Sequence, residues 1–340
     1  MATAPTSMVV VVMMLLTFVA PALSGETIAG QLSYDFYSSS CPRAEEVIQK
    51  TTWEIISKDT NMGAALVKFF FLDCFVMGCD ASLLLAVDDD NPDTEKSMLH
   101  QHGYAYDNVD NVNLYNTVNK IKEAVEAICP GVVSCADILA LAARDSAAIA
   151  GGFSFAMPTG RRDTPRPFYY YMDYHSDAPH SYLEAFELID SFAYRGLDID
   201  DLVVLSGAHS FGIAHCGNFD SLLYPSIHPT MNATYAAELK KVCPWPSPFE
   251  MGPIVNNNRV TDPNVLSNQY YSNVLTGQVL FWSDHMLMSR NDTAAKVAFY
   301  ANNPLAWKVR FAAAMVKMGK IQVLTGTQGE VRMVCNATNY

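Results

Sequence analysis

Apolar residues recur along most of this chain at the three- and four-residue spacing that predicts α-helices. Residues 43–57 carry one such stripe, whereas residues 64–71 are apolar on nearly every side, as is typical of a buried helix. Further helices are predicted at residues 114–128, 135–150, 183–194, 200–205, 293–301 and 304–318. The pattern therefore predicts a mainly α-helical protein.

Helix boundaries and turns refine this pattern. Pro130 and Gly131 end the helix at 114–128, and either Asp198 or Asp200 is a suitable N-cap for the helix at 200–205. Only residues 321–324 and 329–332 have strand character, and we expect them to form a short hairpin around Gly326. Two polar stretches, 86–112 and 244–268, predict long loops.

The N-terminus resembles a secretory signal peptide. The uncharged apolar run at residues 8–20 is shorter than the roughly 20 residues that span a bilayer, and suits the central region of a signal sequence. Cleavage after Ser24 would remove residues 1–24, and cleavage after Gly30 is the alternative. The other interpretation is a buried N-terminal helix. No later apolar run reaches membrane length, so we expect no membrane span.

Length and charge limit the classes of protein that remain. The 340 residues allow one large domain or two lobes, and half of them are hydrophobic, so a sizeable core is expected. The formal net charge is −13. An acidic surface argues against binding to nucleic acid or to anionic membranes, because phosphate contacts need lysine and arginine.

The cysteines agree with a secretory route. There are eight, and in a secreted chain they predict four disulfides, although their spacing leaves the pairing open. Cys74 and Cys79 are too far apart for a zinc knuckle. Asn-x-Thr sequons at Asn232, Asn291 and Asn336 are candidate glycosylation sites.

Two motifs identify a family. Residues 73–85 read DCFVMGCDASLLL, and residues 203–216 read VVLSGAHSFGIAHC. Together they resemble the haem-flanking helices of secreted plant (class III) peroxidases, and the resemblance covers residues 31–335. It implies the mainly α haem peroxidase fold, with a distal lobe at about 31–160, a proximal lobe at about 161–335, haem between them and a short tail at 336–340.

The resemblance also implies chemistry and location. The expected cofactors are haem b and Ca²⁺, the partners are H2O2 and small phenolic donors, and the protein is a monomer secreted to the extracellular space or the cell wall. The disulfides that it implies pair Cys41 with Cys129, Cys74 with Cys79, Cys135 with Cys335, and Cys216 with Cys243. It further implies a buried ion pair of Asp137 with Arg162, and a donor channel lined by Pro179.

His209 is the expected proximal ligand of the haem iron. It lies on one helix face with Leu205, and Gly207 and Gly212 allow a close approach of another group. A ligating histidine normally donates its second ring N–H to a carboxylate. Asp284, in the place of the family's Ser-Asp segment, is the expected acceptor. A structural histidine and a helix N-terminal aspartate are the alternatives.

The resemblance places one calcium site near residue 80. Side-chain oxygens of Asp73, Asp80 and Ser82, with the carbonyls of Val76 and Gly78, form an oxygen-rich set of the kind that Ca²⁺ prefers. The alternative is an Asp-rich turn without a metal.

A second calcium site is expected beside the proximal helix. Ser210, Asp262, Val265 and Ser267 stand where the family has its ligands. Ser267 replaces a carboxylate, and lost ligand charge weakens calcium binding. One calcium ion is therefore expected, and two only if Asp262 compensates.

The distal positions depart from the family. Its pattern R-x-H-F-H-D-C is here Lys68 to Cys74, so Leu72 replaces the acid–base histidine and Lys68 replaces the arginine. Leucine has no donor or acceptor and cannot transfer a proton, and lysine lacks the planar donor fork of arginine. We expect a secreted haem peroxidase whose activity is impaired. The alternatives are an inert haem-binding pseudo-peroxidase acting as a binding or structural wall protein, and a structural glycoprotein that has lost haem.

Overall fold

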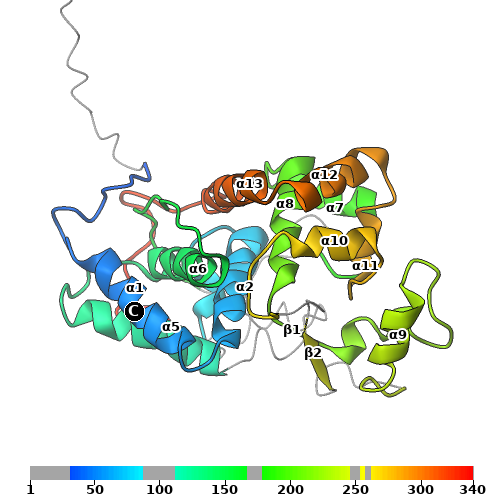
Figure 1. Ribbon diagram of the computed structural model, residues 1–340. Helices are drawn as coiled ribbons and strands as arrows, with labels where there is room; N and C mark the ends of the chain where they lie inside the picture. The colour runs from blue at the N-terminus through cyan, green and yellow to red at the C-terminus, as the bar shows by residue number, and fades with distance from the viewer. Residues whose placement is uncertain (1–30, 87–111, 167–177, 246–252, 257–261, 340) are drawn as a thin grey trace, which may run out of the picture.

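A computed structural model describes residues 31–86, 112–166, 178–245, 253–256 and 262–339. Figure 1 shows two neighbouring groups of helices, and α2 is the member of the first group that lies beside the second. The predicted signal peptide, nearly all of the predicted loop at 86–112 and about half of the predicted loop at 244–268 fall outside the described residues. The first group contains α1 (Ala44–Ile56), α2 (Asn61–Val76), α5 (Val112–Glu126) and α6 (Cys135–Gly151).

The second group follows in the sequence. Its members are α7 (Ala185–Tyr194), α8 (Ile199–Ser206), α10 (Gln269–Leu275), α11 (Trp282–Met286), α12 (Asn291–Asn302) and α13 (Pro304–Met318). Short 3₁₀ turns are η1 (Ser82–Leu84), η2 (Gly207–Ser210), η3 (Cys216–Asn218) and η4 (Asp220–Leu222). The predicted helices are confirmed. Three short helices, α10, α11 and α9 (Ala233–Leu239), were not predicted, because five to seven residues give too weak a periodic signal.

Local signals explain where the main helices begin. The Ser134 hydroxyl caps α6 by accepting a hydrogen bond from the Asp137 amide, and Gly152 ends that helix in the left-handed conformation. Asp198, rather than Asp200, caps α8 and forms a capping box with Asp201. Asp200 instead faces α12 and α13, where its carboxylate pairs with lysine and arginine.

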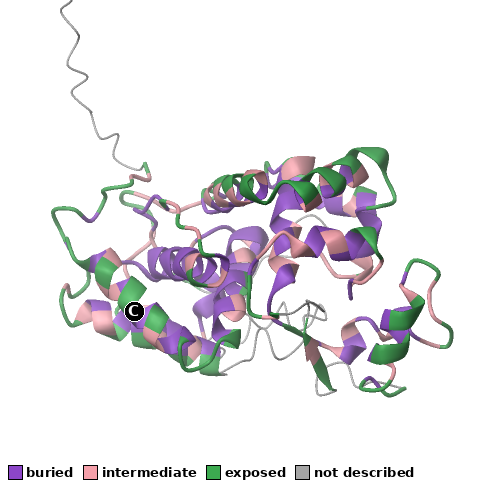
Figure 2. Ribbon diagram, viewed as in Figure 1, coloured by how far each residue is buried: buried purple, intermediate pink, exposed green. Residues whose placement is uncertain are grey.

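One hydrophobic core runs through both groups of helices. It contains residues of α2 and α6 together with residues of α8, α10 and α13. Figure 2 shows α6 and α2 as almost entirely buried, whereas α1 and α13 are buried along one face only. A second, smaller cluster gathers around η3, η4 and α9. Residues 64–71, which are apolar on nearly every side, therefore lie in a helix that is buried on most of its sides.

The small amount of β-structure differs from the prediction. β1 (Ile213–His215) and β2 (Ile254–Asn256) form an antiparallel pair with Ala214 opposite Val255. The predicted hairpin around Gly326 is wrong. Its two arms form bridges to a third segment instead, Leu324 to Arg162 and Glu330 to Asp163. The backbone donors and acceptors of the arms are satisfied by this segment, which lies far away in the sequence.

The buried ion pair on α6 uses the neighbouring arginine, so the predicted pair of Asp137 with Arg162 is wrong. Asp137 binds Arg161 at 2.8 Å, and both side chains are fully buried. Arg162 donates to the carbonyl oxygen of Gln328. Consecutive side chains of extended backbone point in opposite directions, so only one of two adjacent arginines can face the core.

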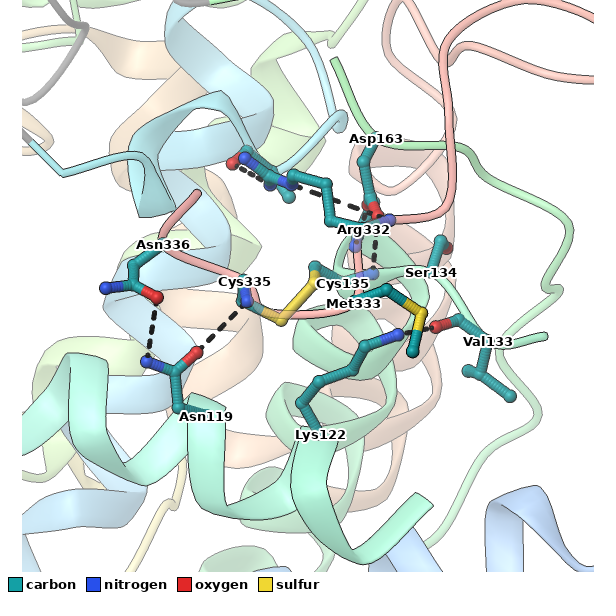
Figure 3. Close-up of a disulfide and its surroundings, with 12 residues drawn as sticks. Asn119, Lys122, Val133, Ser134, Cys135, Asp163, Arg332, Met333, Cys335 and Asn336 are labelled. Atoms are coloured by element: carbon teal, nitrogen blue, oxygen red, sulfur yellow. Dashed lines mark hydrogen bonds and ion pairs between the residues drawn. A yellow bond between two sulfur atoms is a disulfide. The ribbon is translucent and has the colours of Figure 1, made fainter. Parts of the chain in front are cut away.

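All four disulfides implied by the resemblance are present. The Cys135–Cys335 disulfide ties the start of α6 to the C-terminal segment (Figure 3). Beside it, the Asp163 carboxylate accepts the amides of Cys135 and Arg332 at 3.1 and 2.9 Å. The C-terminus is thus fixed to the first helical group by both covalent and hydrogen bonds.

Candidate active site

His209 lies in η2, directly after α8. Its ring packs between Phe281, at a centroid distance of 5.0 Å, and Tyr270, at 6.2 Å. The side chain is nevertheless 40% exposed. The close approach predicted at Gly207 is made by a side chain of the protein itself. A Cβ at this position would lie 2.7 Å from the Trp307 indole nitrogen. The close approach predicted at this glycine therefore serves packing of α8 on α13.

Asp284 of α11 is the partner of His209, as predicted. Its Oδ1 lies 2.9 Å from His209 Nδ1, and its side chain is only 4% exposed. The same Oδ1 accepts a hydrogen bond from the Tyr270 hydroxyl at 2.6 Å. Burial, and then the charge of Asp284, raise the pKa of Tyr270 well above its usual range, so this hydroxyl remains a donor.

The sequence did not predict a role for Tyr270, because a single tyrosine in a short helix forms no recognisable pattern. Its role depends on α10 packing against η2 and α11, which are distant in the sequence. The two ring nitrogens of His209 have different roles. Nδ1 is committed to the carboxylate, so Nε2 is the nitrogen that remains for a metal. These residues fit an axial haem ligand and its carboxylate partner.

The distal helix α2 is apolar where the family pattern has its acid–base histidine. Leu72 is 1% exposed and belongs to the hydrophobic core, whereas Lys68, one turn earlier in the helix, is exposed. The rings of Phe71 and Phe75 are 4.9 Å apart, and Phe75 packs on Phe192 of α7 at the same distance. The region around position 72 is therefore apolar, and Leu72 itself is part of the core.

The side chains predicted for the first calcium site gather in one turn closed by the Cys74–Cys79 disulfide. Asp73 is 1% exposed, and the Ser82 side chain hydrogen-bonds Asp80. Burial raises the pKa of Asp73 well above its usual range, with the charge of Asp80 adding to the effect. Burial also raises the pKa of Asp80 to about 6. Two adjacent carboxyl groups withdrawn from water fit a divalent cation, which would stabilise their charged forms.

The two predicted carbonyl ligands have other partners in this turn. The Val76 carbonyl accepts a hydrogen bond from the Arg195 guanidinium, and the Gly78 carbonyl accepts one from the Asp80 amide at 2.9 Å. Gly78 has φ +108°, and a Cβ there would lie 2.7 Å from the carbonyl oxygen of Gln322. Glycine is thus required at this position. Arg195, which the sequence analysis did not consider, brings a positive charge to the loop.

The second predicted calcium site is only partly assembled. The Ser210 hydroxyl accepts a hydrogen bond from the Ser267 amide at 2.9 Å, which joins η2 to the following loop. Asp262 is exposed, and its carboxylate accepts the Asn264 amide at 3.0 Å. Val265 is 38% exposed. Among the described residues, Asp262 and Ser210 share no hydrogen bond, so the second calcium site stays a prediction.

Comparison with known proteins identifies the family of this chain. A family model described as Peroxidase matches residues 48–303. Peroxidase 12 of Arabidopsis thaliana is 39% identical over 312 residues, which cover 91% of this chain and 83% of that protein. Peroxidase 2 of Oryza sativa subsp. japonica is 39% identical over 328 residues, which cover 96% and 98%. Cationic peroxidase SPC4 of Sorghum bicolor is 38% identical over 317 residues, which cover 92% and 83%.

The chain belongs to the plant peroxidase family. The resemblance to class III peroxidases and the mainly α peroxidase fold are thereby confirmed. By family the protein is a haem peroxidase, with H2O2 as the oxidising substrate. Among the residues that the structure describes, every helix is too short or too polar to cross a bilayer.

The remaining predicted positions of this peroxidase lie at its surface or near the proximal site. Pro179 is half-buried, and two residues later the Ser181 carbonyl accepts the Ser283 amide at 2.8 Å, beside Asp284. Two of the sequon asparagines, Asn291 and Asn336, are exposed. Asn232 is half-buried, and its side-chain oxygen caps α9.

Proposed function

We propose that this protein is a secreted haem peroxidase that binds haem through His209 and reacts slowly with H2O2 because Leu72 replaces the distal base. The 2.9 Å contact of His209 with a buried carboxylate supports the first part. The 1% exposure of Leu72 within an apolar core supports the second. Haem, when bound, supplies the redox chemistry of its iron.

The residues of the site would divide the work as follows. His209 Nε2 would ligate the iron, while Asp284 would accept a hydrogen bond from the Nδ1–H group and raise the basicity of the imidazole. Leu72 accepts no proton from peroxide and returns none to the leaving oxygen. Positioned proton transfer contributes ~10²–10⁴-fold in rate, so its loss is the main deficit. Lys68 supplies positive charge without the fork geometry of arginine.

The other parts of the proposal concern partners and ions. Small phenolic donors are expected at Pro179, which adjoins the loop that precedes Asp284. One calcium ion is held by Asp73, Asp80 and Ser82, with the carbonyls of Val76 and Gly78 as further ligands. The chain is secreted as a monomer to the extracellular space or cell wall, with glycans at Asn232, Asn291 and Asn336.

A second candidate function is an inert haem-binding protein that serves as a binding or structural component of the wall. The burial of Leu72 favours it, because this part of α2 offers packing surface in place of a proton acceptor. Both candidates share haem binding by His209. They differ in whether peroxide reacts with the loaded protein.

Two measurements test the proposal. The protein reconstituted with haem should show a Soret band that His209→Ala removes or shifts. His228→Ala is the control, because the His228 ring packs on Trp282 of α11 and its Nδ1 pairs with the hydroxyl and the backbone amide of the nearby Thr230. An unchanged spectrum in His209→Ala would refute the ligand assignment.

Stopped-flow mixing of the loaded wild type with H2O2 then separates the two functions. A slow spectral change that scales with peroxide concentration supports an impaired peroxidase. No change over minutes at millimolar peroxide supports the inert haem-binding protein.

A further inference from the structure

We infer that Tyr270 is a positioning residue that tunes His209 through Asp284. The inference rests on the proposed role of His209 as the haem ligand. The Tyr270 hydroxyl and His209 Nδ1 meet the same carboxylate oxygen, Asp284 Oδ1, at 2.6 and 2.9 Å. One oxygen therefore serves two donors.

Sharing this oxygen weakens its pull on the histidine proton. A hydrogen bond to a carboxylate stabilises its negative charge and leaves less of that charge for a second donor. Tyr270 is 1% exposed and Asp284 is 3% exposed, so water does not screen the effect. With Tyr270 in place, the Nδ1 proton stays more fully on His209, and Nε2 becomes a weaker electron donor.

The consequence for a metal on Nε2 is a higher reduction potential. A strongly basic axial ligand favours the ferric state, and hydrogen bonding around the ligand is one means by which a protein tunes the metal. The distal side lacks its base, so peroxide cleavage depends more heavily on electron donation from His209. Tyr270 restrains that donation, which stabilises the ferrous state relative to the ferric state.

Tyr271 provides a matched control on the same helix. Its hydroxyl is equally buried, but it donates to the carbonyls of Val203 and Val204 in α8, at 3.0 and 3.2 Å. Replacing either tyrosine with phenylalanine removes one buried phenolic hydroxyl. Only Tyr270→Phe removes a donor from Asp284.

The test is spectroelectrochemical titration of the haem-loaded full chain. Tyr270→Phe should lower the ferrous-to-ferric ratio at fixed potential about tenfold, which corresponds to a midpoint lower by ~59 mV for a one-electron couple. The iron–histidine stretch of the ferrous protein should rise in resonance Raman spectra, because His209 becomes more basic. Tyr271→Phe should change neither quantity. An equal shift in both variants, or no shift in Tyr270→Phe, overturns the inference.

A double-mutant cycle shows whether the effect passes through Asp284. In an Asp284→Asn background, Tyr270→Phe should no longer move the potential, and a shift of unchanged size would refute the route through Asp284. His209→Ala distinguishes the two levels of failure. If it leaves the Soret band intact, the proposed function fails. If it removes the band while Tyr270→Phe shifts nothing, only this inference fails.

Discussion

The distal helix α2 and the proximal elements η2, α10 and α11 are held by different kinds of contact. On the proximal side, polar atoms converge: His209 and Tyr270 both meet one oxygen of the buried Asp284. On the distal side, α2 packs through its phenylalanine rings, and Leu72 is buried among apolar neighbours. The proximal side keeps groups that can hold and tune a haem iron, whereas the distal helix has a leucine in place of the family's acid–base histidine.

This difference shows that the packing that stabilises the fold does not depend on the distal catalytic group. A leucine at position 72 suits an apolar helix, so losing the distal base costs the fold little. The polar groups that organise the same half of the molecule are still present. Asp137 accepts Arg161, the Tyr37 hydroxyl at 2.7 Å and the Gly160 amide at 2.7 Å, all within the core. Four predictions test whether the stability of the fold and the reactivity of the site can be changed separately.

The largest effect is expected from the buried ion pair of the distal half. Arg161→Gln should lower the free energy of unfolding by about 3–5 kcal/mol, because it leaves the Asp137 carboxylate buried without its cation. Arg162→Gln is the matched control and should cost less than about 1 kcal/mol, since Arg162 pairs with carbonyls near the surface. Urea unfolding with the disulfides intact measures both, and equal losses would contradict the assignment of Arg161.

Restoring the distal base should change chemistry and leave the scaffold intact. Leu72→His should raise the second-order rate of reaction with H2O2 by ~10²-fold or more. Adding Lys68→Arg should raise it further, although not additively, because both groups act on one transition state. Stopped-flow spectroscopy of the loaded variants measures these rates.

Leu72→Gln is the control for this pair, because glutamine is polar but accepts no proton at neutral pH. It should stay close to the wild type. If the wild type already reacts with H2O2 as fast as the double variant, Leu72 does not impair the reaction. The contrast between the two sides of the site would then disappear.

Calcium provides the next test, because its two predicted sites belong to opposite sides. Metal analysis of the dialysed protein should find about one ion, held near Asp80, since Ser267 replaces a carboxylate ligand of the second site. Asp80→Asn should remove it, and Asp262→Asn should not. At free calcium about ten times Kd, the ion should stabilise the protein by about 1.4 kcal/mol. Two ions in the wild type would show that Asp262 completes the second site.

The smallest effect concerns pH on the proximal side. Burial lowers the pKa of His285, which is 5% exposed on α11 and whose Nε2 has no hydrogen-bond partner among the described residues. The unfolded chain therefore binds a proton more readily than the native state below about pH 6.5, so stability falls as pH falls through this range. His285→Gln should flatten that slope in thermal unfolding, whereas His228→Gln should not. An unchanged slope would assign the acid sensitivity to other groups.

Local patterns were sufficient for the features that depend on short stretches of chain. Periodicity located the long helices, and the motif around residue 80 predicted which oxygens share a turn. The contact of His209 with Asp284 was predicted by resemblance, because Ser283-Asp284 stands in the place of the family's Ser-Asp segment. In each case the necessary residues lie within a few turns of each other, or belong to a pattern that the family shares.

Only the tertiary structure decided which distant groups meet. It selected Arg161 over Arg162 for Asp137, directed both arms of the predicted hairpin to another segment, and placed Tyr270 on the oxygen that serves His209. The physical reason is that a sequence pattern records which side of a segment is apolar. The partner of each buried polar atom is set by how segments far apart in the chain pack, because most such atoms are hydrogen-bonded inside the folded core.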